Sequence, residues 1–312
     1  MMVVHNRPVF TMEYDPAEAF RPLPNSVYVR GRSVEARSDH VETWSNDAQD
    51  VRFVDVANEQ PSAVDVYSAD GHTTTIALRS KDQIGAFWTA IKRPTIYIDI
   101  TGLRHPTWAV LLRGALQTRE RVLVIYVEPA DYRPSLTPTD SEIYDLSERI
   151  EGLAALPGFA YLKDKGDQSC FIPLLGFEGT RLSYLISQLE PPGEKIVPVI
   201  GVPGFRPEYP FVAFLGNRLP LLKTQAWKKA RYAVANCPFD LYYTLEEIAA
   251  EFPNHVLKIA PIGTKPHAVG AVLYAIANPE IVELVYDHPI RKARRTEGTA
   301  RLLVYDVSCL MG

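Results

Sequence analysis

An alternation of apolar runs and helical stretches, beginning near residue 94, constrains the fold more than any other feature. Such an alternation is typical of β-α-β units around a parallel sheet. Several runs are almost continuously apolar, as in strands covered by helices on both faces. The predicted strands are Thr95–Ile100, Val122–Val127, Phe171–Leu175, Ile196–Ile200, Leu257–Ile262, Val282–Tyr286 and Leu302–Val307. The predicted helices cover about 107–118, 140–150, 180–189, 224–235, 244–252 and 267–277. Thr139–Glu142 and Thr244–Glu247 are capping boxes for two of them.

The chain before residue 92 has a different pattern. Residues 1–25 are rich in proline, and we expect an irregular arm there. Residues 26–91 contain short β-branched runs, a hairpin turn at Asp70-Gly71 and a capping box, Ser80–Gln83, that begins a short helix. We therefore predict a small β-rich region at 26–91, followed by a Rossmann-like α/β domain with a mostly parallel sheet over 92–312.

Composition is that of an ordinary globular protein, with 46% hydrophobic and 22% charged residues. Lys and Arg total 33 against 37 Asp and Glu, and the net charge of -4 argues against a dedicated nucleic-acid coat. Cys170, Cys237 and Cys309 lie far apart in the sequence, so we expect neither a disulfide framework nor a metal site. So few cysteines suit a reducing compartment, and we expect the protein in the cytoplasm. No apolar run approaches the ~20 residues that span a bilayer, so we expect no membrane partner.

Three segments of the predicted sheet share one plan: strand, loop glycine with a basic residue, helix, strand, proline. The spacing from glycine to proline is 27, 27 and 26 residues, for Gly102 to Pro129, Gly176 to Pro203 and Gly263 to Pro289. Open α/β sheets bind ligands at the carboxyl edge of their parallel strands. We therefore expect the three glycine loops to meet at one edge of one sheet.

Each of these loops has features of an anion site. Glycine allows a sharp turn and a close approach of the backbone to a ligand. The helix that follows offers unpaired N–H groups at the positive end of its dipole, where phosphate binds readily. Arg104, Arg181 and Lys265 would add positive charge. Turn chemistry alone is the alternative, and no loop has the full glycine pattern of a dinucleotide-binding or nucleotide triphosphate-binding loop.

The segment Gly263–His267 is the strongest single motif. Thr264 could donate a hydroxyl hydrogen bond, Lys265 could face solvent and neutralise a phosphate, and His267 falls in the first helical turn. The alternative for His267 is a partly exposed histidine at a helix start. A basic loop further on adds two arginines. The full set of predicted ligand-binding residues is Gly102, Arg104, Gly176, Glu178, Arg181, Gly263, Thr264, Lys265, His267, Arg294 and Arg295.

Acidic residues also occur at the ends of predicted strands. Such carboxylates can hold Mg²⁺, bind ribose hydroxyls or act as general bases. Helix capping, or pairing with Arg104 and Arg181, is the alternative. If the protein is an enzyme, the candidates for acid, base or metal ligand are Asp99, Glu128, His267 and Asp287. The chain has no recognisable hydrolase or protease motif.

Two stretches resemble the strand–turn–helix loops of CARF-type Rossmann-like domains, which are nucleotide sensors of bacterial defence proteins. These stretches are Asp99–Gly102 and Ile262–Lys265. The first reads Thr-Gly-Leu-Arg and lacks the family's second glycine and lysine, and the second has Ile262 in place of a glycine. The resemblance implies nucleotide sensing in antiviral defence. No nuclease effector motif follows, which differs from many members of that group.

The function that these patterns favour is binding of a nucleotide or another phosphorylated ligand at the carboxyl edge of the sheet. One alternative is an enzyme that cleaves or transfers a nucleotide-like substrate at the same place. Another is a non-enzymatic subunit that binds a protein partner through the N-terminal region or the proline-rich loops. A nucleic-acid contact through Arg294 and Arg295 is also open.

Overall fold

The computed structural model describes residues 10–31, 33, 35–68, 71–118, 120–139, 142–144, 146–161 and 168–311. The chain forms two compact units. Unit 1 contains Met1–Asp131 and Thr296–Gly312, and unit 2 contains Tyr132–Arg295. The division therefore lies away from residue 92, because strands from the β-rich region pair with the strand at 95–99 in a single sheet.

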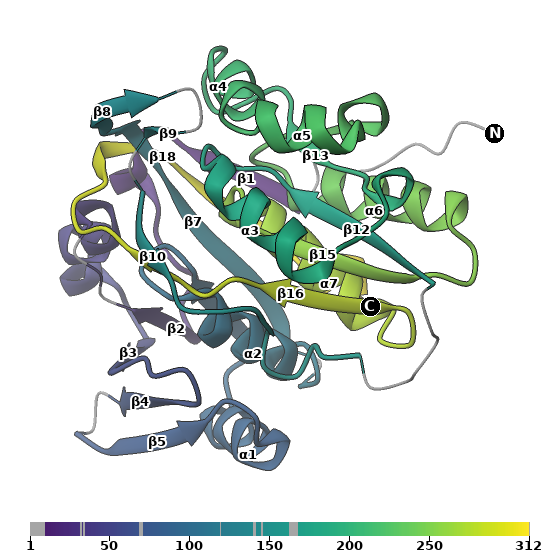
Figure 1. The fold of residues 1–312 in the computed structure, drawn as a ribbon. Coiled ribbons are helices and arrows are strands. Elements are labelled where there is room, and N and C mark those ends of the chain that lie inside the picture. The colour runs from purple at the N-terminus through teal and green to yellow at the C-terminus, as the bar shows by residue number, and fades with distance from the viewer. Residues whose placement is uncertain are drawn as a thin grey trace. The chain divides into compact units, whose positions relative to one another are not determined.

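Unit 1 is built on an eight-stranded sheet with the order β1-β18-β7-β6-β2-β3-β4-β5 (Figure 1). These strands are β1 (Thr11–Tyr14), β18 (Thr296–Asp306), β7 (Arg121–Tyr132), β6 (Thr95–Asp99), β2 (Ser26–Gly31), β3 (Val51–Ala57), β4 (Ala63–Ser68) and β5 (Thr73–Ala77). The pairs β2–β3, β2–β6 and β6–β7 are parallel. The pairs β1–β18, β3–β4 and β4–β5 are antiparallel, so the sheet is mixed.

Helices and an aromatic cluster complete unit 1. The helical elements are η2 (Ala17–Ala19), η3 (Ala36–Thr43), η4 (Ser45–Asp47), α1 (Lys81–Ile91), α2 (His105–Ala115) and α8 (Ser308–Met311). The rings of Phe20, Tyr28 and Trp44 pack edge to face or tilted, with centroids 5.3–6.4 Å apart. All three side chains are fully buried, so burial of large aromatic area stabilises this part of the unit.

Unit 2 contains five consecutive parallel strands with helices between them. They are β12 (Ser169–Leu174), β13 (Val199–Gly201), β14 (Arg231–Ala233), β15 (Val256–Pro261) and β16 (Val282–Tyr286). Their spatial order is β16-β15-β12-β13-β14, and β11 (Ala154–Ala155) adds antiparallel to β16. Numbered along the chain, the parallel strands lie in the order 5-4-1-2-3. The direction of strand addition therefore reverses between β12 and β15.

The other elements of unit 2 are helices and two small antiparallel strand pairs (Figure 1). Its helical elements are α3 (Gly179–Leu189), η5 (Gly193–Lys195), α4 (Tyr209–Gly216), α5 (Arg218–Thr224), η6 (Ala226–Lys229), α6 (Pro238–Glu251) and α7 (Lys265–Ala277). Two small antiparallel pairs join β8 (Pro134–Thr139) to β9 (Glu142–Tyr144), and β10 (Ser147–Ile150) to β17 (Pro289–Arg291).

The mixed α/β class predicted from the sequence is confirmed, and each of the seven predicted strands overlaps a strand. Two predicted helices are wrong. Residues 140–150 contain β9 and β10, because strand pairing outweighs the local capping box. Residues 224–235 contain η6 and β14, which pairs with β13. Asp70 of the predicted hairpin lies outside the described residues, while β4 and β5 pair on either side of it.

Helix starts are only partly readable from capping boxes. The box at Ser80 is confirmed, because the Gln83 N–H donates to Ser80 Oγ at 3.3 Å. In contrast, Thr244 lies inside α6, and its hydroxyl donates to Asp240 O at 2.9 Å. The sulfur of Cys237 caps α6 instead, accepting from the Asp240 N–H at 3.4 Å.

Two helix-interior glycines should respond in opposite directions to substitution by alanine. A Cβ on Gly85 would meet no atom within 4 Å, so Gly85→Ala should raise the free energy of unfolding by about 0.5–1 kcal/mol. A Cβ on Gly114 would lie 2.4 Å from Ile84 Cγ2 and 2.9 Å from the Trp88 ring. Gly114→Ala should therefore destabilise by about 1–3 kcal/mol. Urea unfolding of both variants tests this, and equal shifts would contradict the tight contact of α1 with α2.

Candidate functional site

The carboxyl edge of the unit 2 sheet brings two of the predicted loops together. Gly176 follows β12 and Gly263 follows β15, and these strands are parallel neighbours. A Cβ on Gly176 would lie 2.7 Å from the Ile262 carbonyl oxygen, and one on Gly263 would lie 2.6 Å from the Leu175 oxygen. The two loops therefore touch through their backbones, at the point where strand order reverses, and only glycine permits this approach.

Two helices begin next to these glycines. α3 starts at Gly179 and α7 at Lys265. Thr264 is the N-cap of α7, and its Oγ1 accepts the His267 N–H at 3.2 Å. The same hydroxyl donates to the Ala235 carbonyl at 2.8 Å, so its single proton is already used within the protein. The expected hydroxyl donor to a ligand is therefore occupied by the loop before α6.

Arg181 does not offer its charge to this edge. It is buried, and its Nε and Nη2 donate to the two carboxylate oxygens of Asp287 at 2.7 and 2.5 Å. Its Nη1 donates to Ile262 O at 3.1 Å. Burial opposes its charge, but the Asp287 carboxylate raises the pKa of Arg181 above its usual range. The arginine therefore joins α3 to β15 and β16, which is the pairing that the sequence left open as an alternative.

Glu178, at the N-cap of α3, lies beside the same ion pair. Its Oε2 accepts from Ser147 Oγ at 2.9 Å and lies 3.9 Å from Arg181 Nη1. Glu178 and Asp287 therefore surround one guanidinium, and both carboxylates are engaged. This cluster links strand-end acids to a cation as a structural unit.

The basic residues of the Gly263 motif are more buried than predicted. Lys265 is 5% exposed rather than facing solvent. His267 is completely buried, not partly exposed, and its Nε2 lies 3.1 Å from the Val234 carbonyl oxygen. Because a carbonyl only accepts, Nε2 carries the proton, and Nδ1 is a buried acceptor with no hydrogen-bond partner in the described structure. Burial lowers the pKa of His267 to about 4, so the ring is neutral at physiological pH.

Gly102 belongs to a different sheet, so the expectation that three loops share one sheet edge is wrong. It follows β6 in unit 1, and a Cβ there would lie 1.7 Å from Gly31 O at the end of β2. Arg104 is held by Glu59, which accepts from its backbone N–H at 2.8 Å and from Nη1 at 3.3 Å. The matched spacing thus describes β-α-β units, which both sheets contain, rather than neighbours in one sheet.

Asp99 lies at the end of β6 within a buried polar cluster that sequence reasoning missed. Its carboxylate accepts from Tyr28 Oη at 3.0 Å and the Thr101 N–H at 2.9 Å, and lies 2.8 Å from His40 Nε2. Burial alone would raise the pKa of Asp99, but His40 and Thr101 hold it below its ordinary value. Tyr28 and His40 are 71 and 59 residues away in sequence, so no local pattern indicates the cluster.

The remaining predicted residues are also engaged or lie in turns. Glu128 is buried, and its Oε2 lies 3.2 Å from Arg301 Nε in an ion pair. Arg294 is exposed, with φ of 55°, in the turn between β17 and β18, and Arg295 O accepts the Arg133 N–H at 3.0 Å. The four proposed acid, base or metal positions are divided between the two units.

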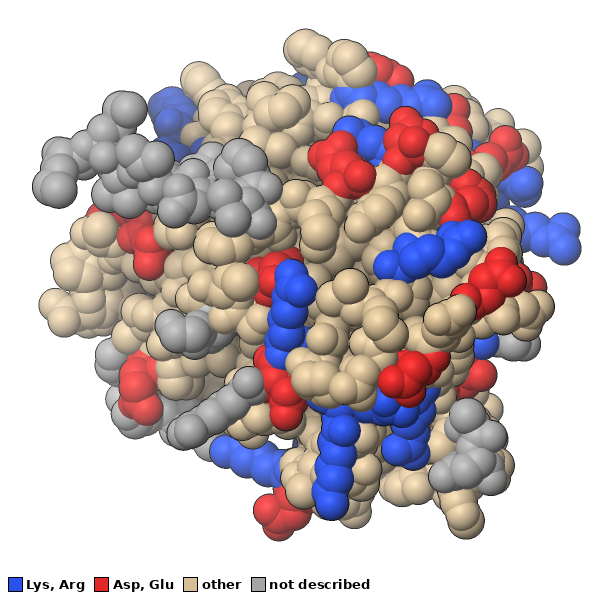
Figure 2. Space-filling view, turned by 180° about the vertical axis from the view of Figure 1, so that it is seen from behind, with Lys and Arg blue, Asp and Glu red and all other residues tan. Residues whose placement is uncertain are grey.

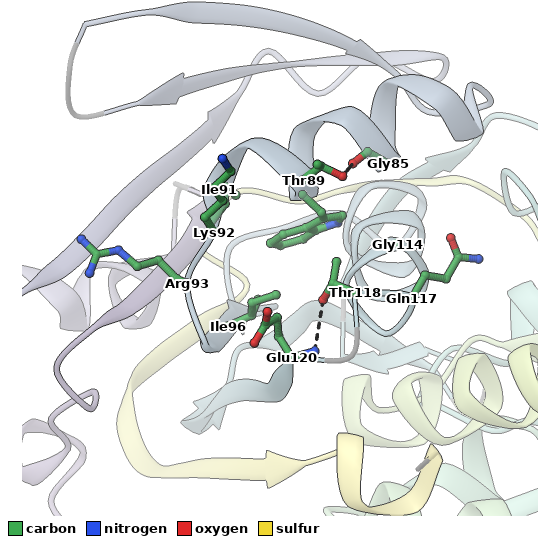
Figure 3. A pocket seen from close by; sticks show the side chains of 11 residues that line it. Gly85, Thr89, Ile91, Lys92, Arg93, Ile96, Gly114, Gln117, Thr118 and Glu120 are labelled. Atoms are coloured by element: carbon green, nitrogen blue, oxygen red, sulfur yellow. Dashed lines mark hydrogen bonds between the residues drawn. The ribbon is translucent and has the colours of Figure 1, made fainter.

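A groove of about 300 Å³ lies between α1 and α2 in unit 1 (Figure 3). Its lining includes the apolar side chains of Trp88, Ile91 and Ile96 and the charged residues Lys92 and Glu120. It adjoins the amino-terminal end of β6, which is the opposite end from Asp99. None of the predicted site residues lines it, so it is separate from the predicted ligand edge.

Acidic and basic side chains are interspersed over the face shown in Figure 2. Among the described residues, no group of three or more His, Cys, Asp or Glu is arranged to hold a metal ion. No helix in the described ranges has the length and apolar character needed to cross a membrane.

Comparison of the chain with protein-family models, with curated proteins and with solved structures finds no match. The functional assignment therefore depends on the residues and their geometry alone.

Proposed function

We propose that this protein binds a nucleotide or another phosphorylated small molecule at the carboxyl edge of the unit 2 sheet. The observation that carries this proposal is the backbone contact of the Gly176 and Gly263 loops at the reversal of strand order. This is the place at which open α/β sheets bind ligands. A Rossmann-like relationship, and with it a sensing role like that of CARF-type domains, belongs to the same proposal.

The chemistry of the proposed site differs from the one expected from sequence. Arg181 is neutralised by Asp287, and Lys265 is buried. The ligand's negative charge would therefore meet the positive dipoles of α3 and α7 and the first N–H groups of α3 rather than free cationic side chains. α7 contributes fewer N–H groups, because Pro266 has none and the His267 N–H already donates to Thr264. We propose binding without turnover, because Asp99, Glu128 and Asp287 are each held in internal contacts.

A charge placed at the start of α3 tests the proposal. Thr180 is exposed in the first turn, so Thr180→Asp should preserve folding, since acids stabilise that end of a helix. The added charge should weaken binding of a phosphorylated ligand about tenfold or more through repulsion at close range. Calorimetric titration with a panel of mononucleotides and dinucleotides measures this.

Thr180→Asn is the matched control, because asparagine has the shape of aspartate without its charge. This variant should bind the ligand as the parent protein does. A panel in which no nucleotide binds the parent would contradict the proposal. Equal affinities of the Asp and Asn variants would also contradict it, since the ligand would then lie away from α3. Nucleotide cleavage during the titration would favour the enzyme alternative.

A further inference from the structure

An unusual number of apolar side chains is exposed on one stretch of unit 2. Eight of the twelve large exposed hydrophobic side chains in the described residues lie between Val202 and Tyr232, so they are concentrated rather than scattered. Phe211 is 77% exposed on α4, and Leu219 is 58% exposed on α5. We define the basic apolar surface by the exposed apolar residues Phe211, Phe214, Leu215, Leu219, Leu222 and Trp227 together with the basic side chains between them.

These elements are consecutive and pack on one another. α5 contacts both α4 and η6, and α4 and α5 are drawn next to each other in Figure 1. On α4, Phe211, Phe214 and Leu215 are spaced three and four residues apart, which places them on one helix face. On α5, Leu219 and Leu222 share a face in the same way. The exposed apolar groups therefore project from adjoining short helices.

The charge of this segment has one sign. Residues 209–232 contain five basic residues and no Asp or Glu, although the whole chain has a net charge of -4. Arg231 is paired with Glu251 outside the segment at 2.7 Å. Lys223 and Lys228 are exposed, and Lys228 Nζ lies 5.8 Å from the centroid of the Trp227 ring. Apolar and cationic side chains are thus interleaved.

We propose that the basic apolar surface docks on an anionic lipid bilayer. Phe, Trp and Leu beside Lys and Arg are the composition of helices that lie in a membrane interface, where apolar groups enter the headgroup region and cations meet anionic lipids. A second copy of the same face would oppose like charges. This proposal departs from the expectation of no membrane partner, which was argued from the lack of a spanning segment, because peripheral docking requires no such segment.

Vesicle sedimentation tests this proposal. The full chain should sediment with vesicles of phosphatidylcholine and phosphatidylserine, and about tenfold less with phosphatidylcholine alone. Binding should weaken as salt is raised, because exposed charges are screened. The double variants Lys223→Glu/Lys228→Glu and Phe211→Ser/Leu222→Ser should each bind at least about tenfold more weakly.

Two controls are made in unit 1, outside the residues that define this surface. Arg79→Glu/Lys81→Glu makes the same charge reversal at exposed residues of unit 1, and Leu23→Ser removes an exposed leucine of unit 1. Both should bind vesicles as the parent does. The proposal is wrong if the parent stays in the supernatant, or if the surface variants bind like the controls. Sedimentation velocity showing a dimer that Phe211→Ser/Leu222→Ser abolishes would assign the surface to a second copy and also overturn the proposal.

Discussion

Arg181→Met should lower the free energy of unfolding by about 3–5 kcal/mol, the largest effect expected from any single exchange discussed. The substitution leaves the Asp287 carboxylate, which is 0% exposed, without the guanidinium that donates two hydrogen bonds to it. An unpaired buried charge is far more costly than the pair was stabilising. Guanidinium chloride unfolding of the parent and the variant measures the loss.

The double variant Arg181→Met/Asp287→Leu distinguishes this mechanism from a general packing defect. Removing both charges should restore part of the loss, because apolar groups of similar volume can replace a buried pair at little cost. Arg231→Met is the surface control, since its pair with Glu251 is solvent-exposed and should contribute less than about 1 kcal/mol. A loss below that value for Arg181→Met would contradict the buried-pair account.

Acidification should destabilise the protein through His267. Its folded pKa of about 4 lies below the ordinary value of 6.5, so the unfolded chain binds more protons between these pH values. The contribution of the neutral buried ring is therefore complete above about pH 6.5 and is lost progressively toward pH 4. Between pH 7 and pH 5 it should amount to about 2 kcal/mol.

Comparison with His267→Gln isolates this contribution from that of the carboxylates. Glutamine can still donate to Val234 O but does not titrate, so the parent should lose about 2 kcal/mol more than the variant between pH 7 and pH 5. His72→Gln, at an exposed position, should follow the parent. Parallel pH profiles for the parent and His267→Gln would show that the histidine is not buried as a neutral ring.

The sequence predicts which segments form strands better than it predicts which strands pair with one another. Runs such as Thr95–Ile100 and Leu257–Ile262 predict strands correctly, because continuous apolar character is a local property of the sequence. The capping box at Thr139 predicts a helix at 140–150, but this segment forms β9, which pairs with the neighbouring β8, and β10, which pairs with the distant β17. The second pairing has no local signal in the sequence. Gly102 was assigned to the wrong sheet for the same reason. A repeated β-α-β pattern carries no information about which sheet receives each strand.

In the candidate site too, the sequence predicts local features but not the long-range contacts of the side chains. The loop glycines and the helix starts at Gly179 and Lys265 are readable from sequence, because turn and capping chemistry is local. The pairing of Arg181 with Asp287 joins residues 106 positions apart. Arg181, which the sequence predicts to bind phosphate, therefore forms an internal ion pair instead. Only the folded arrangement reveals this long-range contact.

Hydrogen exchange of the backbone amides, with and without nucleotides, tests the central claim most directly. If a phosphorylated ligand binds at the reversal between β12 and β15, the amides that begin α3 should exchange more slowly when it is present, as should the Lys265 amide that begins α7. Pro266 has no amide proton, and the His267 N–H already donates to Thr264. The decrease in exchange rate that the ligand causes at these amides should exceed the decrease at any amide in unit 1. Protection confined to the groove between α1 and α2, or a nucleotide that binds without slowing exchange at either helix start, would contradict the proposed site.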